Sequence, residues 1–240
     1  MILICRRKHL LAIVGLVALS AAGLLLAAGT KAVPAFSSQT PQGEIVIIDA
    51  GHGGEDGGAV SADGVAESHI NLSIAKRVEN ILLFLGQETM MTRTGEEAVY
   101  SSDATTLREK KVSDLKNRVA MVNEQEHAVL LSIHQNSYSA GTKGAQVFYY
   151  SADNSGEETE AKRLAGILQN TIREVIGDEN KRVEKGNSSY YMLKNVTCPF
   201  AIVECGFLSN PQEEALLCDE KYQQKMAEGI CEGIENFLYK

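Results

Sequence analysis

The sequence predicts a single α/β domain with a mostly parallel mixed sheet flanked by helices, preceded by an N-terminal apolar segment. Short apolar runs typical of buried strands alternate along the chain with longer stretches typical of helices. Three of these runs lead into residues suited to acid/base or metal chemistry, namely His52, His134 and Glu204. Because active sites of open α/β sheets form at the carboxyl ends of the strands, we expect these side chains to share one edge of the sheet.

The run at residues 45–54 is the most informative of the three. The apolar residues Ile45 to Ile48 read as a buried strand, and a glycine-rich turn after them presents His52. Glycines let the backbone fold tightly beside the histidine and leave room for a large ligand to approach.

The remaining elements alternate in the same way, and the chain shows no repeat, low-complexity tract or second domain. The expected strands are 45–49, 87–92, 128–133, 144–150 and 200–204; the expected helices are 68–85, 157–176, 211–218 and 220–238, with one more helix containing Leu115, Val119 and Val122. We expect loops at 94–109 and around Gly186-Asn187-Ser188.

The N-terminus indicates export. Arg6, Arg7 and Lys8 precede Leu10–Ala28, which are nineteen residues without a charge, and this order places the basic end in the cytoplasm. Both an uncleaved membrane anchor and a cleaved signal peptide fit this segment, and either one exports the rest of the chain to the outer face of the membrane or the cell wall. The predicted regions are 1–30 as signal peptide or anchor, 31–43 as a polar linker and 44–240 as the catalytic domain.

The charge of the exported part argues against two kinds of interaction. Without the first 28 residues the chain has 20 Lys and Arg against 31 Asp and Glu, a formal net charge of −11. Such a charge argues against nucleic acid as a partner and against electrostatic adhesion to anionic lipids. Membrane attachment therefore depends on the N-terminal segment alone.

The cysteines predict neither a zinc site of their own nor a dense disulfide framework, since the sequence contains no CxxC. Cys198 and Cys205 flank an expected strand, which would hold them on the order of 20 Å apart, too far to bridge. A pair between Cys218 and Cys231 stays open.

The polar residues at the strand ends are the ligand types of a catalytic zinc site, which uses three protein ligands and water. His52 and His134 would supply two ligands. Glu67 is the best third ligand because it begins the helix that follows the His52 loop; the alternative is a carboxylate that interacts with the helix dipole. Glu204 ends an apolar strand, where burial without a partner is costly, and a metal or its water would supply that partner. His69 and His127 read as exposed residues.

The chain resembles the zinc-dependent N-acetylmuramoyl-L-alanine amidases of the amidase-3 family over residues 44–238. The matching motifs are Asp49-Ala50-Gly51-His52-Gly53-Gly54 (family D-P-G-H-G-G), Glu67 with Asn71-Leu72 (E-x-x-x-N-L), Met91-Thr92-Arg93, Asn117-Arg118-Val119 with Asn123, Ser132-Ile133-His134-Gln135-Asn136 and Val203-Glu204-Cys205-Gly206-Phe207-Leu208-Ser209-Asn210. Two positions depart from the family pattern: Ala50 replaces a proline and Ser68 a common lysine.

The resemblance implies that His52, Glu67 and His134 bind one Zn²⁺. It implies that Glu204 acts as general base toward the zinc-activated water and then protonates the leaving amine. The substrate would be peptidoglycan, cleaved at the amide between the lactyl group of N-acetylmuramic acid and L-alanine. Asn136 would orient His134 or the substrate, or it simply caps a loop.

A narrower resemblance, through Tyr191-Met192-Leu193-Lys194-Asn195-Val196, is to germination-specific spore-cortex amidases, in which removal of the stem peptide precedes muramic-lactam formation. It implies a site of action in the forespore intermembrane space. Vegetative wall turnover or cell separation, another exported zinc hydrolase such as a deacetylase, and a non-catalytic wall-binding protein remain as alternatives. The 94–109 segment is too short and polar for a helix that blocks the zinc, and the need for a protein activator stays open.

Overall fold

A computed structural model describes residues 44–152 and 158–240. The predicted signal peptide or anchor and the linker, residues 1–43, lie outside this part of the chain. No helix among the described residues is both long and apolar enough to cross a membrane.

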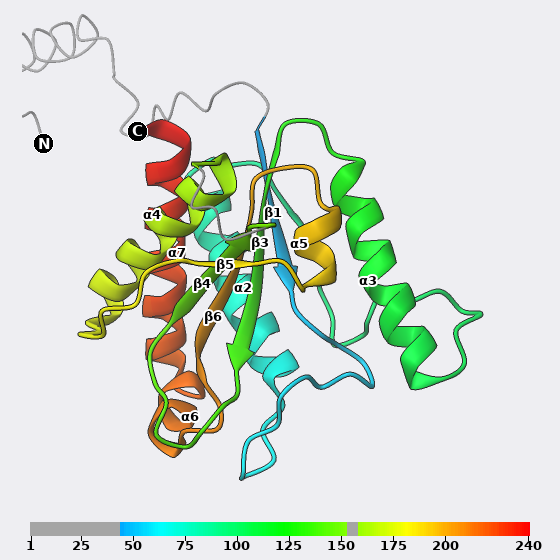
Figure 1. Cartoon of the computed structure of the whole chain (residues 1–240), viewed down its shortest axis with the longest axis horizontal. Helices are drawn as coiled ribbons and strands as arrows, with labels where there is room; N and C mark the ends of the chain where they lie inside the picture. The colour runs from blue at the N-terminus through cyan, green and yellow to red at the C-terminus, as the bar shows by residue number, and fades with distance from the viewer. Residues whose placement is uncertain (1–43, 153–157) are drawn as a thin grey trace, which may run out of the picture. The chain divides into compact units, whose positions relative to one another are not determined.

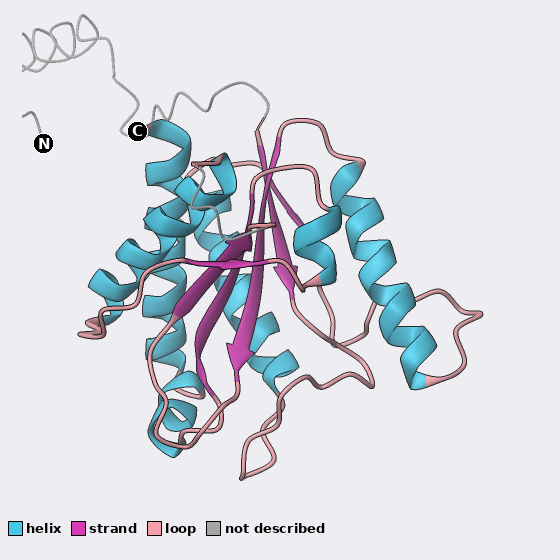
Figure 2. Ribbon diagram, in the orientation of Figure 1, coloured by secondary structure: helices cyan, strands magenta, loops and turns pink. Residues whose placement is uncertain are grey.

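The described residues form one mixed sheet, as the sequence predicts, with six strands where five were expected (Figures 1 and 2). Its order is β2-β1-β3-β6-β4-β5, and every neighbouring pair is parallel except β4 with β6. The strands are β1 (Ile45–Ala50), β2 (Thr89–Met91), β3 (Ala128–Asn136), β4 (Gln146–Tyr150), β5 (Lys185–Asn187) and β6 (Phe200–Phe207). β3 and β6 are central neighbours, so residues at their carboxyl ends meet.

Helices cover both faces of the sheet (Figure 1). The helices are α2 (Glu67–Phe84), α3 (Leu107–Asn123), α4 (Glu160–Ile176), α5 (Tyr191–Asn195), α6 (Pro211–Leu217) and α7 (Glu220–Tyr239). α2, α4 and α7 pack into one apolar cluster with alternate strand residues such as Val46 and Ile48, whereas Ile47 points into a second cluster with α3 and α5. Because both faces are covered, the central strands are almost continuously apolar.

Local signals fix several helix ends. α3 begins with a capping box, in which the Thr106 side chain accepts from the Glu109 backbone and the Glu109 side chain accepts from the Thr106 backbone. Asn210 caps α6, whose first residue is Pro211. α4 ends at Gly177 in the left-handed conformation.

Three details of the predicted elements were wrong. β3 continues past its predicted end at residue 133 to Asn136, so His134 is a strand residue, and β6 continues past Glu204 to Phe207. His134 and Glu204 are paired with each other. Both strands continue because each provides the other's backbone partners beyond this pair, with a register shift between His134 and Asn136. β5 occupies the predicted loop around Gly186, because pairing with the edge of β4 decides its conformation.

Candidate active site

The turn after β1 holds His52 in an unusual backbone conformation. His52 has a φ of 60°, in the left-handed region that non-glycine residues seldom adopt unless the surrounding structure imposes it. Two buried arginines impose it by donating to carbonyls of this turn: Arg118 to His52 at 2.8 Å, and Arg93 to Ala50 at 2.8 Å and to Gly51 at 3.0 Å. These hydrogen bonds therefore hold the turn, and with it the His52 ring, in a fixed position.

Two glycines leave the space in which the site assembles. A Cβ on Gly51 would lie 2.3 Å from the His134 ring, and one on Gly58 would lie 2.4 Å from Cγ of Glu67. Any side chain at either position would displace one of these residues. The glycines of the motif are thus needed for close approach as well as for the turn.

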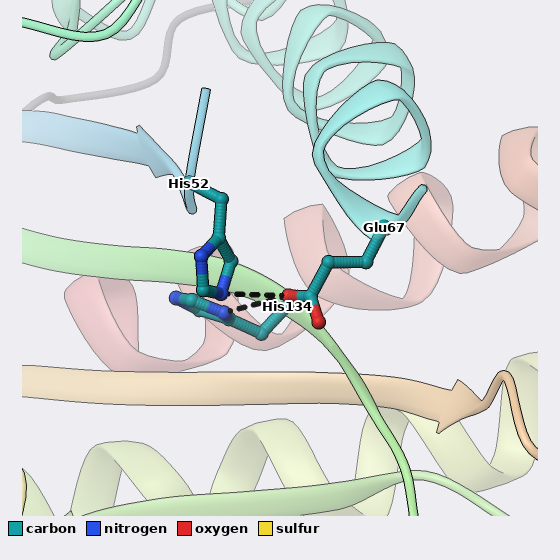
Figure 3. Close-up of side chains that lie close together, drawn as sticks. All are labelled: His52, Glu67 and His134. Atoms are coloured by element: carbon teal, nitrogen blue, oxygen red, sulfur yellow. Dashed lines mark hydrogen bonds and ion pairs between the residues drawn. The ribbon is translucent and has the colours of Figure 1, made fainter. Parts of the chain in front are cut away.

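The structure brings His52, Glu67 and His134 together from the end of β1, the first turn of α2 and β3 (Figure 3). Nε2 of His52 and Nδ1 of His134 both lie 3.1 Å from the same oxygen, Oε1 of Glu67. Burial opposes ionisation of Glu67, but hydrogen bonds from His134 and His52 outweigh it and hold the pKa of this carboxyl well below its usual range. The side chains form a compact, charge-coupled cluster.

This cluster fits a metal ion. A tetrahedral zinc ion with bonds of about 2 Å holds its ligand atoms roughly 3.3 Å apart, and one donor atom from each residue lies within 4.8 Å of the others. Within residues 44–152 and 158–240, it is the one group of three or more His, Cys, Asp and Glu side chains with that property. Two nitrogens and one carboxylate oxygen are a donor set that zinc accepts.

Further hydrogen bonds orient the three side chains. Nδ1 of His52 lies 2.9 Å from Oδ2 of Asp56, an arrangement typical of metal-binding histidines, whose second nitrogen donates to a carboxylate. Glu67 accepts from the Ala59 backbone at 2.7 Å and from Asn71 at 3.2 Å. Sequence reasoning missed Asp56, although a carboxylate four residues after His52 was a readable signal.

Glu204 lies beside this cluster on β6, directly across from His134. It is 7% exposed, and its Oε2 has no hydrogen-bond partner among the described residues. Burial raises the pKa of Glu204 to about 7, with His134 and His52 opposing the rise and Glu67 adding to it. A buried carboxyl with a free oxygen and a pKa near neutrality can accept and release a proton.

A cavity of about 370 Å³ opens onto these residues. Its walls include His52, Glu67, His134 and Glu204, and its apolar side is formed by Leu115, Tyr190, Tyr191, Met192 and Ile202. The predicted loop at 94–109 is shorter than expected, because α3 begins at Leu107. Residues 94–106 contain no helix that could block the site. The volume of the cavity lies in the range typical of ligand-binding pockets.

The other residues that the sequence singles out are not part of the cluster of His52, Glu67 and His134. Oδ1 of Asn136 accepts from the Ser137 backbone at 2.8 Å, as expected of a loop cap, although the residue also lines the cavity. His69 and His127 are exposed, as predicted. Cys198, Cys205, Cys218 and Cys231 are all free thiols, so the pair left open between Cys218 and Cys231 is not formed.

An ion-pair network beneath the site accounts for Asp49 and Arg118, each of which belongs to one of the motifs quoted above. Arg118, 1% exposed, donates to Asp49 at 2.6 Å and to Asp114 at 2.7 Å. Burial opposes ionisation of Asp49, but Arg118 and the hydroxyls of Ser132 and Thr92 lower its pKa to about 2. The network joins β1 to α3 directly below the His52 turn.

Replacing Arg118 by methionine is expected to destabilise the fold by about 3–5 kcal/mol, because Asp49 and Asp114 would remain buried without a cation. Urea-induced unfolding measures this loss. Arg108→Met is the matched control: it removes an exposed arginine from the same helix and should change stability by less than about 0.5 kcal/mol. Equal unfolding midpoints for both variants would show that the network contributes nothing.

Comparison with known proteins agrees with this geometry. The N-acetylmuramoyl-L-alanine amidase family Amidase_3 matches residues 46–236. The germination-specific N-acetylmuramoyl-L-alanine amidase of Bacillus subtilis is 36% identical over 197 residues, covering 82% of this chain and 80% of that protein.

Solved structures show the same fold. The CwlD amidase from Clostridioides difficile, in complex with the GerS lipoprotein, has a TM-score of 0.76 and 34% identity, over 81% of this chain and 98% of that one. The catalytic domain of CwlV, an N-acetylmuramoyl-L-alanine amidase from Bacillus (Paenibacillus) polymyxa var. colistinus, has a TM-score of 0.67 and 31% identity, over 81% and 98% of the two chains.

The chain belongs to the Amidase_3 family. It is accordingly an enzyme, an N-acetylmuramoyl-L-alanine amidase that acts on peptidoglycan. The deacetylase and the non-catalytic wall-binding protein are set aside by this assignment.

Proposed function

We propose that the chain is a zinc-dependent amidase in which His52, Glu67 and His134 hold a single zinc ion. The observation that carries the proposal is the convergence of two histidine nitrogens on one oxygen of Glu67, each at 3.1 Å. Zinc bound there would polarise the scissile carbonyl and acidify a water molecule. Asp56 keeps a proton on Nδ1 of His52, which leaves Nε2 free to act as a ligand.

Glu204 is the proposed proton carrier. Glu204 lines the cavity beside the three proposed ligands, and its buried Oε2 has no hydrogen-bond partner among the described residues. From this position the carboxyl can take a proton from the attacking water. The same carboxyl then delivers that proton to the nitrogen of L-alanine as the amide bond breaks. The pKa of about 7 in the absence of a cation falls when a divalent cation is nearby, so the base is ionised at neutral pH.

The proposed biological role is removal of stem peptides from the spore cortex before muramic-lactam formation. It is supported by the similarity to a germination-specific amidase and to an amidase solved with a lipoprotein. By this analogy the enzyme works outside the cytoplasmic membrane, held there or exported by its N-terminal segment, and it binds a protein partner. Vegetative wall turnover or cell separation is the competing role.

The reaction can be tested on purified peptidoglycan. We expect the chain from about residue 36 to release intact stem peptides with a new L-alanine amino terminus. Chelator should stop the release and added zinc should restore it, both followed by mass spectrometry. Release that persists in chelator would contradict the zinc proposal, and free acetate in place of peptide would contradict the amidase reaction itself.

A further inference from the structure

Lys111 is the one Lys or Arg side chain among the described residues that line the catalytic cavity. The other ionisable residues on the cavity wall are the carboxylates Glu67 and Glu204, the two histidines, and the tyrosines Tyr190 and Tyr191. Once His52 and His134 are ligands of the proposed zinc ion, the Lys111 ammonium is the side-chain cation that an anionic group of a substrate would meet at this wall.

The ammonium of Lys111 is held in place but has capacity for another partner. Its Nζ lies 3.1 Å from Oδ2 and 3.4 Å from Oδ1 of Asp56, and Asp56 is bonded in turn to His52. The Lys111 side chain is nevertheless 51% exposed. A lysine has three donors, so an ammonium anchored on one carboxylate can also donate to a second acceptor that enters the cavity.

The simpler interpretation is that Lys111 only clamps the loop after β1 onto α3. Lys110 shows what such a clamp looks like: it pairs with Glu55 and lies over the Tyr100 ring, 5.3 Å from its centroid. Lys110 lines a small pocket of about 10 Å³, which Lys111 also borders, but it is absent from the walls of the catalytic cavity. The neighbouring lysines thus make equivalent ion pairs, but Lys111 alone combines that pair with a place in the active site.

Substrate chemistry indicates which group Lys111 meets. In the glycan the sugars are N-acetylated and the lactyl carboxyl is consumed in the scissile amide, so the negative charge near the reaction lies on the peptide. The carboxylate nearest to the scissile bond belongs to the residue after L-alanine, when that carboxyl is free rather than amidated. The ammonium is held by Asp56, which is hydrogen-bonded to His52. These contacts set the distance between the ammonium and the proposed metal ligands, and so the position at which a substrate carboxylate could bind.

We propose that Lys111 is a specificity-determining residue that binds this stem-peptide carboxylate and favours substrates in which it is not amidated. The proposal rests on the proposed function, since it places the peptide beside the cluster of His52, Glu67 and His134. Charge-assisted hydrogen bonds of this kind fix orientation as well as adding affinity.

The test uses the full-length, zinc-loaded enzyme and two muropeptides that differ only in a free or amidated carboxyl on the residue after L-alanine. Hydrolysis of both by the unsubstituted enzyme tests the proposed function separately. We expect Lys111→Gln to raise KM for the free carboxylate about tenfold, equivalent to about 1.4 kcal/mol. The rise for the amidated substrate should be at least fivefold smaller, and Lys111→Arg should retain most of the preference.

Lys110→Gln is the matched control, because it removes the neighbouring ion pair without altering the cavity; it should leave the preference between the substrates as it was. Equal losses on both substrates with Lys111→Gln, or loss of zinc from that variant, would show that Lys111 acts through Asp56 and His52, and would overturn the proposal. An unchanged KM for both substrates would overturn it as well.

Discussion

Replacing Glu204 by glutamine is expected to lower kcat by about a thousandfold while the protein keeps one zinc ion per chain. Glutamine has nearly the same shape as glutamate but cannot take a proton from water at neutral pH. Because Glu204 lies outside the group of three proposed ligands, its loss should not release the metal. Turnover of a soluble muropeptide and metal analysis of the same sample measure both properties.

Glu235→Gln serves as the control, since it removes a partly buried carboxyl from α7 that does not line the cavity. That variant should turn over substrate like the unsubstituted enzyme. Normal turnover by Glu204→Gln would remove Glu204 from the mechanism. Loss of zinc from the same variant would make Glu204 a ligand instead of a base.

Replacing Glu67 by alanine is expected to weaken zinc binding by more than about a hundredfold and to abolish activity together with the metal. Substitutions of outer partners of metal ligands cost about 10–100-fold in affinity, and direct ligands cost more. Asp56→Asn provides that comparison within this site, because Asp56 contacts Nδ1 of His52, whereas Nε2 is the nitrogen that faces Glu67. Competition with a zinc-binding dye measures the zinc affinity of each variant, and we expect the Glu67→Ala protein to bind zinc more weakly than the Asp56→Asn protein.

Circular dichroism of the Glu67→Ala protein serves to separate loss of the metal from loss of the fold, since Glu67 also accepts from the Ala59 backbone. A folded variant with unchanged zinc content would show that the ligand assignment is wrong. Equal affinities for the Glu67 and Asp56 variants would also be inconsistent with Glu67 as a direct ligand.

The sequence was sufficient for the α/β class because strand and helix patterns are local. The period of apolar residues identifies β1, β3, β6 and the long helices without reference to their partners. His52 and His134 could be placed at one sheet edge because parallel strands bring their carboxyl ends together. Glu67 followed from the same logic, since a helix after a strand begins near that edge.

The missed features depend on contacts between segments distant in the sequence. β5 has only three residues, including Gly186, and it is a strand because β4 offers it a free edge. The continuation of β6 past Glu204 depends on pairing with β3. The arrangement of Lys111 and Asp56 joins residues 55 positions apart, and no local pattern specifies such a contact.

The most direct test of the zinc site is a crystal structure of the zinc-loaded protein with diffraction data collected above and below the zinc absorption edge. The account predicts one anomalous difference peak, with ligand distances of about 2.0–2.2 Å to His52, Glu67 and His134, and with Glu204 outside the coordination sphere. A peak bound by other residues, or an active crystal form with no peak between these three side chains, would contradict it.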